Sequence, residues 1–243
     1  MQEIDMKTAI LVDGGFYRKR AKFLWGEKTP ENRASELMAY CSAHLKYEQK
    51  FGDRSLYRIF YYDCPPIDKT VYHPLLQRGI DLRHSETHKW TIAFYDQLKK
   101  QRKVALRMGK LSDDFATYSI SPEALKSLCS NKKKISDLSE KDFHITVQQK
   151  GVDMKIGIDI ASLSYKRQVD QIILIAGDSD FVPAAKLARR EGIDFVLDPM
   201  WADIKSDLFE HIDGLSSMWK KKNKNSHSDV YSDDADDKGG THE

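Results

Sequence analysis

One stretch, residues 171–181 with the sequence QIILIAGDSDF, limits the folds open to this chain more than any other. It is an unbroken apolar run, rich in β-branched residues, that ends at Gly177 and is followed by Asp178 and Asp180. Such a run predicts a strand buried on both faces, as in the centre of a parallel sheet. Ligands of open α/β sheets bind at the carboxyl ends of the strands, so the two aspartates fall where a functional site is expected.

The two aspartates have two readings. Carboxylates separated by one residue repel each other, which either raises a pKa or requires a cation, and we favour a cation. Alternatively, Ser179 or Asp180 caps the helix predicted by the following sequence, FVPAAKLARREG, because Ser and Asp side chains accept hydrogen bonds from the free N–H groups of a first turn. The stretch alone does not choose between a cap and a metal site.

The start of the chain repeats the pattern. Residues 7–13, KTAILVD, predict a second buried strand that ends in Asp13 and is followed by two glycines, which permit a tight turn. Residues 16–25, FYRKRAKFLW, then mix basic and aromatic side chains. They indicate a nucleic-acid surface with Arg18 and Lys19 as candidate contacts, or an ordinary amphipathic helix with solvated charges.

The rest of the chain alternates between strand and helix patterns. Apolar spacing and breaker residues predict strands at 55–63, 104–109, 144–149 and 193–197, helices at 33–51, 89–103, 152–165 and 180–191, a short helical piece around 71–78 and a last helix within 200–217. This succession predicts an α/β fold, a Rossmann-like three-layer sandwich with a mainly parallel central sheet.

Two segments stand apart from that succession. An insertion at about 110–143 is polar and contains Lys132, Lys133 and Lys134, with at most short helices near 122–129; it is either a basic clamp for a phosphate backbone or a surface excursion. Residues 220–243 run from basic to acidic with almost nothing to bury, which predicts a disordered charged tail. We therefore expect one domain, residues 1–219, and a tail.

A third acidic position follows the sequence KGVD. Apolar residues recur at helical spacing after Gly151, so Asp153 falls in the first turn of a predicted helix, where the helix dipole favours a carboxylate. Asp159 lies six residues later, turned by about 240° and about 9 Å along the axis. We take Asp153 as the ligand and Asp159 as a supporting or helix–sheet contact.

Composition narrows the class of protein. A chain of 243 residues with 40% hydrophobic content can bury one substantial core. Its three cysteines are widely spaced without a CxxC pair, which argues for reduced thiols and against a zinc knuckle. No apolar stretch approaches the roughly 20 residues of a membrane span, and the first residues do not resemble a signal peptide. We expect a cytoplasmic protein with no membrane association.

The acids Asp13, Asp153, Asp178 and Asp180 all follow strands or begin the next helix, so the fold brings them towards one edge. Four carboxylates need compensation, and hard cations such as Mg²⁺ or Mn²⁺ select oxygen ligands. Such ions activate water and stabilise the charge that develops on a phosphodiester, which is nuclease chemistry.

Five motifs, VDGGFYRKR, YYDCPP, LRMGKL, QKGVDMKIGIDIA and AGDSDFVPAAKLAR, together resemble the NYN domain of the LabA-like group, within the PIN-like nuclease superfamily. The resemblance spans about residues 7–213 and implies a PIN-like fold, divalent-metal-dependent cleavage and RNA, single-stranded or structured, as the substrate. By motif it assigns catalysis and metal binding to Asp13, Asp153, Asp178 and Asp180. Many members carry Asn three residues after the first Asp, where this chain has Phe16.

Further expectations complete the site. Lys150 is a candidate phosphate contact or an exposed lysine, and Ser179 a candidate hydrogen-bond partner of a ligand carboxylate. Two rivals stay open: a catalytically weak or inactive module that binds nucleic acid or protein, which the Phe16 departure suggests, and a metal-dependent phosphatase. No GxxxxGK[ST] motif is present, which argues against a P-loop nucleotide hydrolase. Cleavage of DNA and assembly into a homo-oligomer are left open.

Overall fold

The computed structural model describes residues 5–46, 53–112, 116–147 and 149–219, so the tail predicted at 220–243 lies outside the described residues. Its centre is a sheet of six parallel strands in the order β12-β11-β10-β1-β2-β5. The strands are β1 (Met6–Asp13), β2 (Arg54–Asp63), β5 (Val104–Met108), β10 (Gln171–Ile175), β11 (Asp194–Asp198) and β12 (Gly214–Leu215). The α/β fold class is confirmed, and the sheet is parallel throughout.

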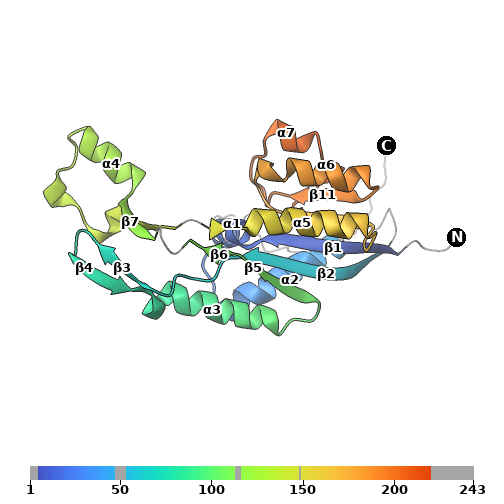
Figure 1. Cartoon of the computed structure of the whole chain (residues 1–243), viewed down its shortest axis with the longest axis horizontal. Coiled ribbons are helices and arrows are strands. Elements are labelled where there is room, and N and C mark those ends of the chain that lie inside the picture. The colour runs from blue at the N-terminus through green and yellow to red at the C-terminus, as the bar shows by residue number, and fades with distance from the viewer. Residues whose placement is uncertain (1–4, 47–52, 113–115, 148, 220–243) are drawn as a thin grey trace, which may run out of the picture.

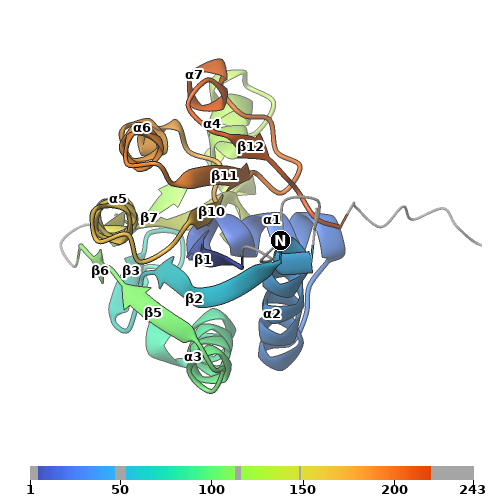
Figure 2. The same ribbon diagram turned by 90° about the vertical axis from the view of Figure 1, so that its right-hand side faces the viewer.

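Helices cover both faces of this sheet, as Figure 2 shows. One face carries α1 (Gly14–Trp25), α2 (Pro30–Lys46) and α3 (Glu86–Lys99), and the other carries α5 (Val152–Tyr165), α6 (Val182–Arg190) and the single turn α7 (Ser206–Phe209). Alternate residues of β1 pack into the two layers: Ala9 and Leu11 join one core cluster, Ile10 and Val12 the other. All five residues of β10 are buried, as expected of a strand covered on both faces.

The strand order reverses between β1 and β10, the two central strands. From β1 the chain proceeds through α1 and α2 to β2 on one side, whereas from β10 it proceeds through α6 to β11 on the other side. The two connections leave on opposite faces of the sheet. Such a reversal opens a crevice at the carboxyl ends of the strands, which is where open α/β sheets bind their ligands.

A small lobe extends beyond the carboxyl ends of the strands (Figure 1). It consists of residues 67–81 and 116–147: the hairpin β3 (Thr70–His73) with β4 (Arg78–Asp81), the hairpin β7 (Thr117–Ile120) with β8 (Phe143–Thr146), and α4 (Pro122–Cys129). The ring of His73, buried, packs against Tyr118 and Phe143, with centroids 4.3 and 5.1 Å away. A two-stranded ladder of β6 (Lys110–Leu111) with β9 (Gln149–Lys150) lies at its base.

The lobe corrects two expectations. Residues 71–78, predicted as a short helix, form β3, its turn and the start of β4, because alternate residues of β3 face a core supplied by the distant β7–β8 hairpin. The strand predicted at 144–149 does not join the central sheet: it splits into β8 and β9, each with an antiparallel partner in the insertion.

The last predicted helix, within 200–217, is also wrong. Met200 and Trp201 adopt positive φ of 47° and 60°, which stops a right-handed helix, and only the turn α7 is helical. Asp213 then accepts a hydrogen bond from the Phe195 amide at 2.9 Å, and Gly214–Leu215 becomes the edge strand beside β11. The other predicted helices and strands are found within a few residues of their expected ends, except that the end predicted at residue 51 for the 33–51 helix lies outside the described residues.

The structure shows the state of the three cysteines and the length of the apolar helices. Cys41 and Cys64 are buried and Cys129 is exposed, and all three are free thiols. Within the described residues, no helix combines the length and apolar content needed to cross a bilayer.

Candidate active site

Two of the predicted acids flank the point where the strand order reverses. Asp13 is the last residue of β1 and caps α1, its Oδ1 accepting the Phe16 amide at 3.0 Å. Asp178 follows β10 by three residues and caps the 3-10 turn Ser179–Phe181 (η6), accepting the Asp180 amide at 3.1 Å. Capping therefore occurs in GDSDF, by Asp178 rather than by Ser179 or Asp180, and it occupies one carboxylate oxygen at this site.

Repulsion between carboxylates links all four acids, Asp13 to Asp153 and Asp153 to Asp178 and Asp180. Burial raises the pKa of Asp13 to about 6, against hydrogen bonds from the backbone, and the charges of Asp153 and Asp63 raise it further. The pKa of Asp153, in the first turn of α5, is raised by burial and then by Asp178 and Asp180. The acids from β1, α5 and the β10 turn therefore share one electrostatic environment at the carboxyl edge.

The acids suit a hard cation by donor type, because all are carboxylate oxygens that repel one another. Within the described residues, however, no three acidic, His or Cys side chains are already arranged as a metal-binding group. Asp153, Asp178 and Asp180 are exposed. Exposed side chains change rotamer rapidly, so a ligand set can close around an ion without movement of the backbone.

Phe16 contributes an apolar surface to this acidic region. A Cβ atom added at Gly177 would lie 2.4 Å from Cε2 of Phe16, so the ring lies directly against the Gly177 backbone. Gly177 connects β10 to Asp178, and Phe16 lies in the first turn of α1, after Asp13. The ring thus connects the two acid-bearing turns, and the close contact explains why glycine precedes Asp178.

The sequence did not reveal the role of Asp63 at the end of β2. Its carboxylate is fully buried and forms an ion pair with Nη2 of Arg18 at 2.9 Å. It also accepts hydrogen bonds from the Cys64 amide at 2.8 Å and the Tyr61 hydroxyl at 3.2 Å. Arg18, predicted to contact substrate, is therefore already paired, and it presents the remaining part of its guanidinium at this edge. The motif YYDCPP did contain a signal for it, because the predicted strand ends in Asp63 just as the first strand ends in Asp13.

Two further aspartates have structural partners. Asp159 accepts hydrogen bonds from the Tyr62 hydroxyl at 2.8 Å and from Arg107 at 3.0 Å, which bears out the expected helix–sheet contact. Asp198, at the end of β11, is buried and bonded to His44 at 2.7 Å and to Ser217 at 2.8 Å. Asp198 was not singled out in the sequence, and its bonds fasten the C-terminal segment to the sheet.

The other predicted contacts are spread around the edge. Lys150 is exposed on β9, paired in register with Lys110 of β6, just before the helix that carries Asp153. Ser179 accepts a hydrogen bond from Lys205 at 3.2 Å, so its hydroxyl contacts a cation rather than one of the acids. Lys19 is exposed on α1. Lys19 is therefore a solvent-facing charge.

Comparisons with known proteins identify a domain type over part of the chain. The family model described as NYN domain matches residues 97–204, which include Asp153, Asp178 and Asp180 but not Asp13. No curated protein matches. A crystal structure of a protein of unknown function from Vibrio parahaemolyticus is 14% identical, covers 90% of this chain and 96% of its own, and has a TM-score of 0.46. That structure has no known activity to compare. NYN domains belong to the PIN-like nuclease superfamily, which indicates a nuclease-type domain.

Proposed function

We propose that this protein is a divalent-metal-dependent nuclease that hydrolyses phosphodiester bonds of RNA at the carboxyl edge of its parallel sheet. The observation that carries the proposal is the convergence of Asp13, Asp153 and the Asp178–Asp180 turn on the point where the strand order reverses, with the pKa of Asp13 and of Asp153 raised by burial and by neighbouring carboxylates. The NYN match over residues 97–204 supports a nuclease-type domain, and the proposal that it is of the LabA-like type rests on the five sequence motifs.

In this proposal the chain's own residues fix where the reaction occurs. Asp13, Asp153, Asp178 and Asp180 would hold Mg²⁺ or Mn²⁺, which supplies Lewis-acid activation of water and charge stabilisation when bound. Asp13 is held by the first turn of α1 and Asp178 by its bond to the Asp180 amide, so both carboxylates approach from fixed backbone positions. Lys150, three residues before Asp153, and Arg18, five residues after Asp13, would contact substrate phosphates.

The bond changes are those of hydrolysis. A water oxygen forms a bond to phosphorus, one phosphorus–oxygen ester bond breaks, and the leaving oxygen receives a proton. The pKa of Asp13 is about 6 without a cation, and a bound cation would favour its ionised, ligating form, so the proton would come from solvent water.

A second candidate function is a catalytically weak or inactive module that binds nucleic acid. The observation favouring it is the Phe16 ring, which lies against Gly177 between the two acid-bearing turns, where many members of the resembling group carry Asn. An apolar ring donates no hydrogen bond to a water or a ligand carboxylate. This alternative predicts RNA binding without turnover.

The test is a time course on end-labelled single-stranded RNA with Mg²⁺, Mn²⁺ or EDTA, run with the wild-type protein and with Asp178→Asn. We expect cleavage that requires metal and is lost in Asp178→Asn, because the substitution removes an anionic ligand. The variant retains an oxygen to accept the Asp180 amide, so its fold is preserved.

The matched control is Asp96→Asn, which removes an exposed carboxylate of α3 that pairs only with Lys99. It should cleave like the wild type. Absence of cleavage with any metal, together with retained RNA binding, would overturn the nuclease proposal and favour the binding module. Metal-dependent cleavage that persists in Asp178→Asn would place the reaction elsewhere.

A further inference from the structure

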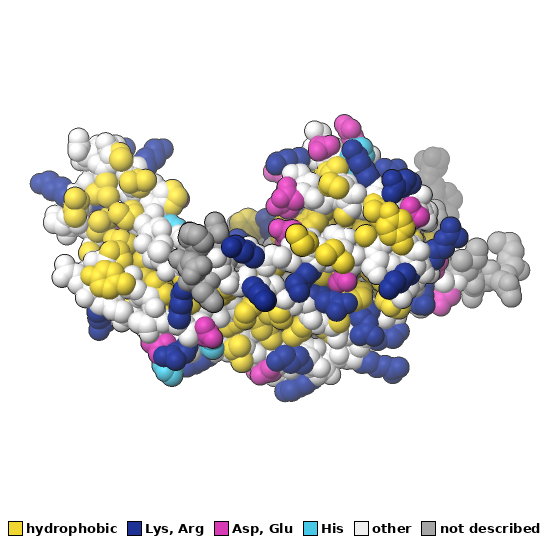
Figure 3. Space-filling model, viewed as in Figure 1, with side chains coloured by type: hydrophobic (Ala, Val, Ile, Leu, Met, Phe, Trp, Pro, Cys, Tyr) yellow, Lys and Arg dark blue, Asp and Glu magenta, His cyan; other side chains and the backbone are white. Residues whose placement is uncertain are grey.

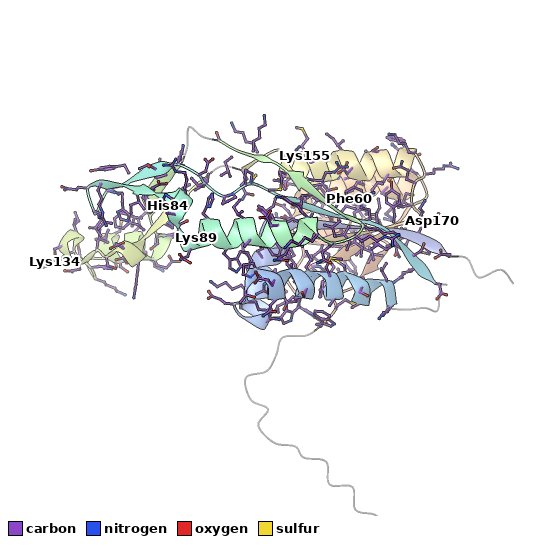
Figure 4. The ribbon with its side chains drawn as sticks, turned by 90° about the horizontal axis from the view of Figure 1, so that it is seen from below. Phe60, His84, Lys89, Lys134, Lys155 and Asp170 are labelled. Atoms are coloured by element: carbon purple, nitrogen blue, oxygen red, sulfur yellow. The ribbon has the colours of Figure 1, made fainter. Side chains whose placement is uncertain are left out.

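A cavity of about 280 Å³ lies between the start of α3, the chain that follows β2, and the lobe. Figure 4 shows this region from below, with His84 in the turn before α3 and Lys89 in the first turn of α3, both next to the lobe, and Asp170 at the opposite end of the sheet. We call it the α3 cavity. It belongs to the same edge as the acids, because Cys64, which directly follows Asp63, and Arg18, which pairs with Asp63, both line it.

The walls of the α3 cavity are mostly apolar, with a few polar groups. The apolar part comes from Pro65, Pro66, Ile67, Leu82, Ile145 and Val147. Arg18, His88 and Gln149 add polar groups, and in the described part of the chain neither the His88 ring nor the Gln149 amide is engaged in a hydrogen bond. Apolar walls with a few unpaired donors and acceptors are typical of a site for a flat, polar-edged ligand.

A second cavity, of about 380 Å³, continues from the first, since Arg18, Thr87 and Thr91 line both. The basic side chains that line it are compensated: Lys22 pairs with Glu27, and Lys28 and Arg33 pair with Glu36. The second cavity is therefore polar and close to neutral, whereas the apolar walls of the α3 cavity suit a base. Figure 3 shows basic side chains on the body beside the hollow that separates it from the lobe.

We propose that the α3 cavity binds one unpaired nucleobase of the substrate, next to the phosphate held at the acids. Its volume of about 280 Å³ lies just below the range of small-molecule pockets, roughly 300–1,000 Å³, which suits a single base better than a whole dinucleotide. A base can enter only when it is unstacked and unpaired, so the cavity selects single-stranded segments. This inference deepens the proposed function and rests on it for the nature of the substrate.

The probes are the four ribonucleoside 5′-monophosphates and ribose 5-phosphate, with binding to the full chain measured by calorimetry and by saturation-transfer NMR in EDTA. We expect at least one mononucleotide to bind at least ten times more tightly than ribose 5-phosphate. Equal affinity for ribose 5-phosphate would reveal a phosphate site only, and absence of mononucleotide binding at millimolar concentration would equally overturn the proposal.

Two variants locate the binding. Thr87 is exposed on α3 and lines the cavity, so Thr87→Trp fills the opening without disturbing the core and should weaken mononucleotide binding at least tenfold. Ile92→Trp, an exposed position of the same helix outside both cavities, should bind like the wild type. Gln149 lines the α3 cavity and not the second cavity, so Gln149→Ala should change the order of preference among the four bases. Unchanged binding in both Thr87→Trp and Gln149→Ala would refute the assignment.

The two proposals fail separately. Mononucleotide binding in EDTA does not depend on catalysis, so a protein that binds them but cleaves no RNA retains the base cavity and loses the nuclease. A protein that cleaves RNA with metal but binds no mononucleotide retains the nuclease and loses the base cavity.

Discussion

At the scale of single residues, Asp13 makes stability depend on pH. Its pKa is about 6 in the folded chain against 3.8 for an ordinary Asp, so the folded state holds the proton more tightly than the unfolded state. Ionisation of Asp13 therefore lowers the free energy of unfolding. This loss of stability is absent below pH 4, develops as pH rises from about 4 to 6, and is complete above 6. Its upper bound is about 3 kcal/mol.

The substitution Asp13→Asn tests this, because Asn keeps the cap of α1 and removes the charge. In EDTA we expect the variant to match the wild type near pH 4 and to exceed its free energy of unfolding by about 1–3 kcal/mol at pH 7. Urea denaturation at several pH values gives the difference. A difference in the free energy of unfolding that does not change with pH would show that ionisation of Asp13 does not destabilise the fold.

Gly177 provides a second residue-scale prediction. A methyl group there would meet the Phe16 ring at 2.4 Å, so Gly177→Ala should destabilise the fold by about 1–3 kcal/mol. In a Phe16→Ala background the same change should cost much less, because the ring is gone. Gly157→Ala is the matched control: its added Cβ has nothing within 4 Å, so it should stabilise α5 by about 0.5–1 kcal/mol. Equal costs of Gly177→Ala in both backgrounds would disprove the contact.

The acids and their neighbourhood show what sequence can and cannot predict at this scale. Asp13, Asp153 and Asp178 follow from the rule that strand ends carry sites, and the charges of Asp13 and Asp178 both act on Asp153 or are acted on by it. Asp63 and Asp198 also end strands, yet both are buried in structural bonds, to Arg18 and to His44. Their partners lie 45 and 154 residues away along the chain, so no local pattern distinguishes a free carboxylate from a paired one.

At the scale of elements, local pattern predicted the core and failed in the lobe. The strand β10 is buried on both faces, so its own sequence, an unbroken apolar run, is enough to predict it. Residues 70–73 alternate in burial only because Tyr118 and Phe143, far along the chain, supply the other half of their core. A local reading therefore took VYHPLLQR as helix, since it cannot see the opposing hairpin.

The lobe should also open independently of the sheet. His73→Ala removes the ring packed between the two hairpins, and we expect amide exchange in β3, β4, β7 and β8 to accelerate at least tenfold while β1 and β10 stay protected. Hydrogen exchange with mass spectrometry measures this. His84→Ala, at a position with 83% exposed side chain, is the control and should leave exchange unchanged. Equal acceleration in the central sheet would show that lobe and body unfold as one unit.

At the scale of the whole molecule, the proposed cation should stabilise the fold, because a ligand that binds only the folded chain adds to its free energy of unfolding. At a metal concentration 100 times the dissociation constant the gain is about 2.7 kcal/mol, or roughly 5–10 °C in Tm for a domain of this size. Thermal unfolding with Mn²⁺ and with EDTA measures it without reference to activity.

We expect the full shift in the wild type and in Asp96→Asn, which lacks only an exposed carboxylate of α3. Asp153→Asn and Asp178→Asn should lose most of it and be more stable than the wild type in EDTA, since each removes one charge from a repulsive group. An equal shift in all four proteins would mean that Mn²⁺ binds elsewhere, and no shift in the wild type would mean that the acids do not hold it. Loss of the metal effect together with a gain of stability in EDTA is a combination that a purely capping role of Asp178 does not produce, because Asn keeps the cap and would leave stability nearly unchanged under both conditions.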